Sequence, residues 1–123
     1  MSKAMVIDDS RAIRMILSGI LGELGCEVET AVNGKDGLIK AAQGGDWSVF
    51  LVDWNMPEMT GLEFVEAVRK DQRFANTPLM MVTTETEISQ VARALEAGAN
   101  EYVMKPFTKD MIEEKLRLLG IVQ

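Results

Sequence analysis

Four polar residues in this chain each follow directly after an apolar segment that has the composition of a buried strand. Asp8 and Asp9 follow the letters MVI, Asp53 follows VFLV, and Lys105 follows YVM. If these strands are parallel, their carboxyl ends meet at one rim of a sheet. Three carboxylates placed together repel one another and need a cation, whereas a lysine that faces them needs an anion. The four residues therefore indicate a site for a divalent metal ion and a phosphoryl group.

The aspartate pair at the first strand has two interpretations. Asp8 and Asp9 form either a solvated pair favoured by the positive amino end of a helix, or part of a metal site. The expected arrival of Asp53 beside them favours the metal site. Carboxylate oxygens in small number, completed by water, suit Mg²⁺ better than Ca²⁺. The chain contains no histidine, which excludes His-based zinc sites and Ser-His or Cys-His catalysis.

The carboxylate after the third strand also has two interpretations. Asp53 either starts a turn that Pro57 shapes, or acts as a nucleophile that forms an aspartyl phosphate. A phosphoryl group in an acidic cluster needs neutralisation, for which Mg²⁺ and Lys105 are available. Thr83 is placed to donate its hydroxyl to a phosphoryl oxygen, although a β-branched residue is also ordinary in a strand. The bond from Lys105 to Pro106 is either trans or cis, and a cis bond would aim the lysine at the rim.

The apolar pattern predicts five strands that alternate with five helices. The strands are expected at residues 4–7, 27–31, 49–52, 79–82 and 101–104. This alternation predicts an α/β fold, namely a flavodoxin-like doubly wound five-stranded parallel sheet in the order 2-1-3-4-5 with five helices. In that order the first and third strands are neighbours at the topological switch point, where ligands bind.

Helical spacing predicts which side chains are buried. The first helix is expected to begin near Ser10 and to bury a stripe made of Ile13, Ile16, Leu17, Ile20 and Leu24. Its flanks would then expose Arg14, Met15, Ser18 and Leu21, which the core stripe does not need. The second helix is expected at residues 34–43, and the third opens with a capping box at Thr60 and Glu63. The fourth is expected to end at Gly98 and to bury Ile88, Val91, Ala92, Leu95 and Ala99. The fifth begins near Thr108 and buries Ile112, Leu116 and Leu119.

Composition limits the class of protein. The 123 residues suit one domain spanning 1–123, and 47% hydrophobic with 26% charged residues is ordinary for a globular protein. A net charge of -6 argues against a nucleic-acid surface. Apolar runs are too short for a membrane span and the first residues do not resemble a signal peptide, so we expect a cytoplasmic protein with no membrane partner. Cys26 is the only cysteine, which leaves no intramolecular disulfide and suggests simple packing.

Five stretches of the chain together resemble the receiver domain of bacterial two-component response regulators. They are VIDDS, LVDWNMPEMTGLEF, MVTTE, GANEYVMKPF and EEKL, and the similarity covers essentially the whole chain. Within the family the chain is most similar to the chemotaxis response regulators of the CheY type.

The resemblance assigns roles to named residues. It implies that Asp53 is the phosphoacceptor and that Asp8, Asp9 and Asp53, with the backbone carbonyl of Asn55, hold Mg²⁺. It also implies that Lys105 pairs with the phosphoryl group.

The resemblance further implies a switch and a set of tuning positions. Thr83 would move to bond the phosphoryl group while Tyr102 rotates inward. Asn55 and Glu85 would set how long the phosphate survives, as they match the chemotaxis pattern. Thr84 departs from the family, which usually has a small residue there, and this leaves the phosphate lifetime open.

The function implied is that of a stand-alone response regulator with no attached output domain. A sensor histidine kinase would phosphorylate Asp53. The face made by the fourth helix, fifth strand and fifth helix would then bind an output protein such as a flagellar motor switch component. A phosphatase is a further candidate partner. We expect a monomer that is not an enzyme beyond self-catalysed phosphotransfer and autodephosphorylation.

Four alternatives differ in their sequence requirements. A phosphorelay carrier or phosphate sink, which passes phosphate to a histidine phosphotransfer protein, stays open. A phosphatase of the haloacid dehalogenase type needs a second aspartate where Asn55 stands. A flavin carrier needs a phosphate-binding loop after the first strand, where this chain is acidic. A receiver-like scaffold would not need the complete set of Asp8, Asp9, Asp53, Thr83 and Lys105.

Overall fold

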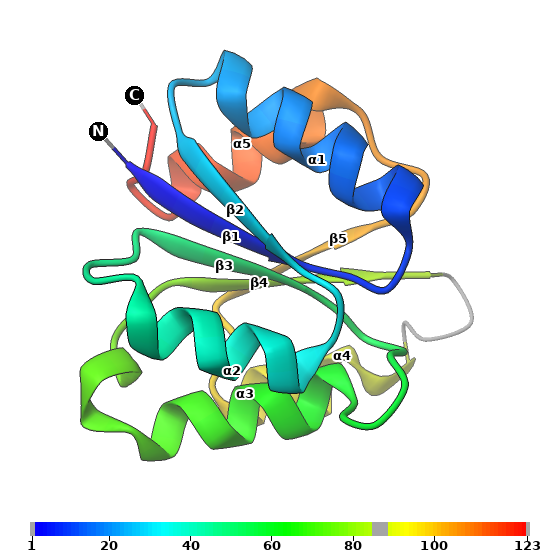
Figure 1. Cartoon of the computed structure of the whole chain (residues 1–123). Helices are drawn as coiled ribbons and strands as arrows, with labels where there is room; N and C mark the ends of the chain where they lie inside the picture. The colour runs from blue at the N-terminus through cyan, green and yellow to red at the C-terminus, as the bar shows by residue number, and fades with distance from the viewer. Residues whose placement is uncertain (1, 85–88, 123) are drawn as a thin grey trace.

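The computed structural model describes residues 2–84 and 89–122, and the chain forms a single sheet with helices on both faces (Figure 1). All strand pairs are parallel and the strand order is β2-β1-β3-β4-β5, which confirms the predicted doubly wound topology. The strands are β1 Lys3–Ile7, β2 Glu27–Ala31, β3 Val49–Asp53, β4 Leu79–Thr83 and β5 Glu101–Met104. The helices are α1 Arg11–Glu23, α2 Gly34–Gln43, α3 Gly61–Lys70, α4 Val91–Ala97 and α5 Lys109–Leu118, with a short 3₁₀ turn, η1, at Gln72–Phe74.

The sheet separates two hydrophobic cores. Helices α1 and α5 cover one face, and α2, α3 and α4 cover the other (Figure 1). The central strands β3 and β4 are buried at every position because both of their faces are covered, and they are apolar up to their last residues, Asp53 and Thr83. Neighbouring residues in β3 point to opposite cores: Phe50 packs with the α2–α4 layer and Leu51 with the α1–α5 layer. This sandwich fixes the register of the strands and therefore the position of their carboxyl ends.

Helix caps begin the elements where the sequence predicts them. The side chain of Ser10 accepts from the backbone N–H of Ile13 at the start of α1. Thr60 and Glu63 form the predicted capping box at the start of α3. Gly98 ends α4 with a φ of 127°, a left-handed conformation that favours glycine. Within the described residues, no helix is both long and apolar enough to cross a membrane.

Two predicted helix stripes are confirmed at most of their residues and wrong at a few. In α1, Leu21 is fully buried in the core on the α1–α5 side of the sheet, whereas Ile16 is 51% exposed. In α4 the inward residues are Val91 and Ala94, while Ala92 is exposed and Leu95 is 41% exposed. In both helices the spacing predicts a stripe, but packing against the sheet shifts the buried face around the helix, to include Leu21 in α1 and Ala94 in α4. Ile88, assigned to the same stripe, lies outside the described residues.

One arginine ties three elements together behind the sheet. Arg69, near the end of α3, donates from Nε to the carbonyl of Gly98 at 3.0 Å and from Nη1 to the carbonyl of Phe74 at 2.6 Å. Its Nη2 donates to Oδ1 of Asn100 at 3.0 Å, and the same oxygen accepts from the backbone N–H of Leu79 at 2.9 Å. The carboxyl end of α4 is therefore fixed to α3, whereas Gln90 at its amino end provides no side-chain cap.

Candidate functional site

The predicted site residues do meet at one rim of the sheet. Asp8 directly follows β1, Asp53 ends β3, Thr83 ends β4 and Lys105 directly follows β5. Strands β1 and β3 are neighbours, with Ile7 paired to Val52, so the next residues of the two strands lie side by side. The parallel topology thus delivers three carboxylates, a hydroxyl and an ammonium to a single place.

The three aspartates form a cluster of oxygen ligands. One carboxylate oxygen from each of Asp8, Asp9 and Asp53 lies within 4.8 Å of the others. Asp8 is 1% exposed and Asp53 is 5% exposed, whereas Asp9 faces solvent. Oδ1 of Asp8 accepts from the backbone N–H of Ser10 at 2.8 Å, which fixes that carboxylate at the start of α1. A donor set made of oxygen alone, partly open to water, fits the coordination preference of Mg²⁺.

Lys105 lies across the buried part of the cluster. Its Nζ is 3.1 Å from Oδ1 of Asp53 and 3.4 Å from Oδ2 of Asp8. The peptide bond between Lys105 and Pro106 is cis, which settles the alternative left open by the sequence. The backbone N–H of Lys105 donates to the carbonyl of Thr83 at 2.6 Å, which continues the β4–β5 ladder to the rim. The lysine thus neutralises one of three negative charges and leaves a formal charge that suits a divalent cation.

Burial and charge crowding change the protonation of the cluster. Burial, with the added repulsion of Asp8, raises the pKa of Asp53 from 3.8 to about 6 although Lys105 opposes this. Burial also raises the pKa of Asp8, against the hydrogen bond from Ser10. For Lys105, burial alone would lower the pKa, but the charges of Asp53 and Asp8 raise it overall. The lysine therefore stays charged, and a cation at the cluster would favour ionised aspartates.

Thr83 carries a buried hydroxyl group that could form a hydrogen bond with a ligand at the rim. The residue is fully buried at the end of β4, and its Oγ1 has no hydrogen-bond partner among the described residues. A buried hydroxyl without a partner costs free energy, so a ligand oxygen at the rim would satisfy it. Thr84 follows it and is half-buried, and Asn55 is exposed on the loop after β3. Glu85, predicted to tune the phosphate lifetime, lies outside the described residues.

Tyr102 lies on the edge strand β5, away from the cluster. It is half-buried and packs against the α2–α4 core. The ammonium of Lys115 lies 5.2 Å from the centre of its ring and pairs with Glu101 at 2.9 Å. The ring lines a shallow groove on the β5–α5 face together with Met104 and Met111. The tyrosine is therefore held at the surface, where a change of its position would alter that groove.

Two features of the site were not predicted from the sequence. Nη1 of Arg14 donates to the backbone carbonyl of Asp8 at 2.8 Å, so this residue supports the cluster. Gly61 donates its N–H to the carbonyl of Trp54 at 2.8 Å, and a Cβ there would overlap the carbonyl of Asp53. The sequence offered little to identify either residue as part of the site. Arg14 lies on the flank of α1, and Gly61 directly follows the cap residue Thr60.

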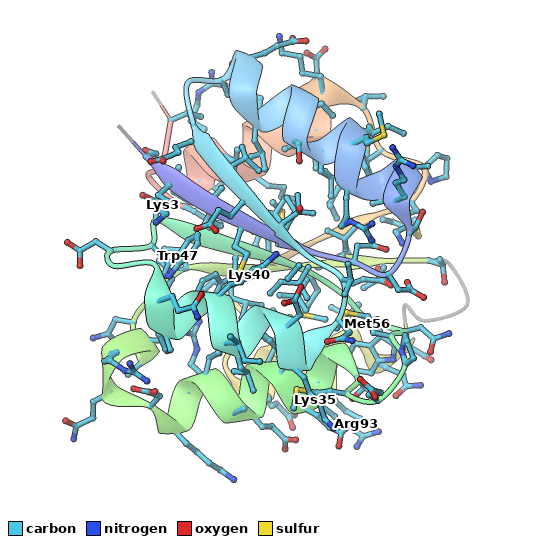
Figure 2. The ribbon with its side chains drawn as sticks, in the orientation of Figure 1. Lys3, Lys35, Lys40, Trp47, Met56 and Arg93 are labelled. Carbon is cyan, nitrogen blue, oxygen red and sulfur yellow. The ribbon has the colours of Figure 1, made fainter. Side chains whose placement is uncertain are left out.

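The two tryptophans lie at opposite ends of the sheet. Trp54 is adjacent to Asp53 and is 8% exposed. Trp47 lies near the amino ends of the strands, where the ammonium of Lys3 is 4.5 Å from the centre of its ring (Figure 2). Met56, on the rim side in Figure 2, is far from this pair. We therefore expect the emission of Trp54 to respond to changes at the cluster, with Trp47 as a background signal.

Comparison with known proteins identifies the family. The family model of the response regulator receiver domain matches residues 4–117. The chain is 43% identical over 118 residues to the chemotaxis protein CheY1 of Helicobacter pylori, with 95% of each chain covered. It is 35% identical over 114 residues to the chemotaxis protein CheY of Pseudomonas aeruginosa, covering 93% of this chain and 92% of that protein.

Solved structures agree with this assignment. The chemotaxis protein CheY4 of Vibrio cholerae matches with a TM-score of 0.90 and 39% identity, covering 97% of this chain and 98% of that one. The response regulator TrrA of Thermotoga maritima, solved in complex with Mg²⁺ and BeF, matches with a TM-score of 0.84 and 32% identity, covering 97% and 99%. The acidic cluster at the rim, the fold and these similarities lead to one conclusion: this chain belongs to the response regulator receiver domain family and is of the chemotaxis CheY type.

Proposed function

We propose that the chain is a phosphorylation-controlled switch in which Asp53 accepts a phosphoryl group from a histidine kinase. The observation that carries this proposal is the position of the Asp53 carboxylate. It lies among the oxygens of Asp8 and Asp9 and 3.1 Å from the ammonium of Lys105. A nucleophilic carboxylate, a metal-binding acid pair and a fixed cation are the parts that phosphoryl transfer to an aspartate requires.

The chemistry follows from these positions. A carboxylate oxygen of Asp53 forms the new bond to phosphorus as the P–N bond of the donor phosphohistidine breaks. The bonding pair leaves with the histidine nitrogen. Asp8, Asp9 and Asp53, with the backbone carbonyl of Asn55, would hold Mg²⁺, which supplies charge stabilisation to the transferring group. Lys105 pairs with a phosphoryl oxygen, and the hydroxyl of Thr83 donates to another.

Phosphorylation at the rim would change the conformation of the α4–β5–α5 surface. The phosphoryl group adds a charge of about -2 and favours the conformation in which Thr83 bonds to it. Movement of Thr83 leaves space behind it that Tyr102 fills, which changes the groove lined by Met104 and Met111. An output protein, in chemotaxis a component of the flagellar motor switch, would bind the α4–β5–α5 face in this state. Thr84 at the mouth and Glu85 would set the lifetime of the phosphate.

Incubation with acetyl phosphate and Mg²⁺, followed by mass spectrometry, tests the phosphoacceptor. We expect one phosphoryl adduct on the wild-type chain and none on Asp53→Asn. Asp46→Asn is the matched control because Asp46 is exposed and distant from the rim, and it should be modified like wild type. A phosphoryl group on another residue, or no adduct at all, would overturn the proposal.

A second experiment addresses partners. Immobilised protein with beryllofluoride and Mg²⁺ should retain an output protein that the untreated protein does not. Retention of a histidine phosphotransfer protein instead would support a phosphorelay carrier. Beryllofluoride-dependent capture should disappear with Asp53→Asn.

A further inference from the structure

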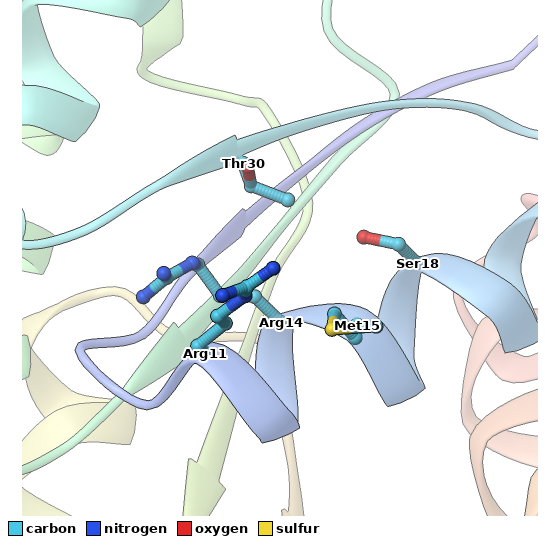
Figure 3. Close-up of a pocket in the computed structure, with 5 residues that line it drawn as sticks. All are labelled: Arg11, Arg14, Met15, Ser18 and Thr30. Carbon is cyan, nitrogen blue, oxygen red and sulfur yellow. The ribbon is translucent and has the colours of Figure 1, made fainter.

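Arg14 makes a hydrogen bond that no feature of the sequence predicted. The residue lies one turn into α1, is half-buried, and donates from Nη1 to the backbone carbonyl of Asp8 at 2.8 Å. Figure 3 shows Arg11 and Arg14 on α1 at a shallow pocket that Ser18 and Thr30 also line. Arg11 lies at the first turn of the same helix and is exposed. The two arginines thus share a helix, a charge and a pocket, but the bond to Asp8 belongs to Arg14.

This bond completes a set that holds Asp8 by all of its polar groups. The backbone N–H of Asp8 donates to the carbonyl of Ala31 at 3.1 Å, and Oδ1 accepts from the N–H of Ser10 at 2.8 Å. Oδ2 faces Lys105 at 3.4 Å. Arg14 holds the remaining group, the carbonyl.

The carbonyl of Asp8 belongs to the peptide unit that leads to Asp9. Because a peptide unit is planar, fixing its oxygen also fixes the direction in which the chain enters Asp9. Asp9 is exposed, so its side chain depends on the backbone for its position more than the buried Asp8 does. A guanidinium that locks this plane therefore directs the exposed carboxylate toward the other two.

We propose that Arg14 is a positioning residue that holds the Asp8–Asp9 peptide in the orientation needed for both carboxylates to bind Mg²⁺. This inference rests on the proposed function, since it assumes a metal at the cluster. The proposed role of Arg14 depends on its hydrogen bond to the Asp8 carbonyl and not on its positive charge. Removal of Arg14 distinguishes the two. If only the charge mattered, Mg²⁺ would bind more tightly, whereas loss of the positioning hydrogen bond should weaken Mg²⁺ binding.

Equilibrium titration with MgCl₂, followed by Trp54 emission and repeated by calorimetry, separates the two roles. We expect Arg14→Met to weaken Mg²⁺ binding by about tenfold, as loss of an outer-shell partner does at other metal sites. Arg11→Met should bind Mg²⁺ as tightly as wild type or slightly more tightly. Arg14→Lys, which keeps the charge and a shorter donor, should lie between Arg14→Met and wild type.

Each outcome decides the proposal. Binding by Arg14→Met that equals or exceeds that of wild type would overturn it, as would an equal loss in Arg11→Met. Thermal unfolding without metal identifies folded variants, and Arg14→Lys carries the test if Arg14→Met does not fold. A wild-type chain that binds no Mg²⁺ would refute the proposed function itself, which distinguishes that failure from a failure of the role of Arg14.

Discussion

The ammonium of Lys105 lies 3.1 Å from Oδ1 of Asp53, so the two side chains form an ion pair at the rim of the sheet. The same ammonium would have to turn to a phosphoryl oxygen once Asp53 is modified. If Asp53 is phosphorylated as proposed, we therefore expect Lys105 to compete with a metal ion before phosphorylation and to act together with it afterwards.

Replacing Lys105 should separate these two contributions. We expect Lys105→Met to bind Mg²⁺ several-fold more tightly, because one positive charge beside the carboxylates is lost. Binding of beryllofluoride in the presence of Mg²⁺ should weaken, since a contact to the phosphoryl analogue is lost. Titrations followed by Trp54 emission measure the binding of Mg²⁺ and the binding of beryllofluoride. Lys109→Met, which removes an exposed lysine paired with Glu23, is the control and should change neither.

The raised pKa of Asp53 predicts how stability depends on pH. In the folded chain its pKa is about 6 and in the unfolded chain close to 3.8, so the folded state holds the proton more tightly. As pH rises from about 4 to about 7, the unfolded state loses this proton first, and ionisation destabilises the metal-free fold by roughly 1–3 kcal/mol. Three charged groups act on this carboxylate: the negative charges of Asp8 and Asp9 raise the pKa of Asp53, and the positive charge of Lys105 lowers it.

Urea denaturation of wild type and Asp53→Asn in EDTA checks this dependence. The variant should be more stable than wild type at pH 7.5, and the difference should shrink toward pH 4.5. Saturating Mg²⁺ should remove or reverse the difference at pH 7.5, because the ion stabilises the ionised wild-type site. A difference that does not change with pH would contradict the raised pKa.

The unpaired hydroxyl of Thr83 predicts a loss of switching without a loss of stability. Thr83→Val removes a buried donor that has no partner among the described residues, so the resting fold should keep its stability or gain up to about 1 kcal/mol. Tyr102 is the only tyrosine, so a fluorotyrosine label gives one NMR signal. Beryllofluoride should shift that signal in wild type and in the control Thr77→Val, but not in Thr83→Val. A full shift in Thr83→Val would show that Tyr102 responds by another route.

A matched pair of glycines tests how the loop beneath Asp53 is held. Gly61→Ala should destabilise the fold by roughly 1–3 kcal/mol, because the new Cβ overlaps the carbonyl of Asp53. Gly22→Ala lies inside α1 with open space around it and should stabilise the fold by about 1 kcal/mol. Both values come from urea denaturation. Equal effects of the two substitutions would mean that the loop yields to the Cβ.

The sequence predicted the sheet and its rim well because strands covered on both faces have an unmistakable apolar composition. Val49–Asp53 is buried at every position, and its neighbours repeat the pattern. Parallel pairing then fixes where Asp8, Thr83 and Lys105 emerge, so the meeting of these residues could be deduced without coordinates.

The helix faces and the supporting contacts could not be deduced in the same way. In α4 the small Ala94 is buried and the larger Leu95 is 41% exposed, because this short helix packs on the sheet through Ala94. The contact of Arg14 with the Asp8 carbonyl depends on a side-chain conformation, and the sequence does not determine it. Tertiary packing decided both features.

The hydrogen bond from Arg69 to the carbonyl of Gly98 has a consequence for amide exchange. Helix α4 is fastened at its carboxyl end and lacks a side-chain cap at Gln90, so its opening motions should be graded along its length. Amide hydrogens near Val91 should exchange with deuterium faster than those near Ala97, and Arg69→Met should erase the gradient by freeing the slow end. A helix held in this way can move at its amino end, near the acidic rim, while its carboxyl end keeps its place in the fold.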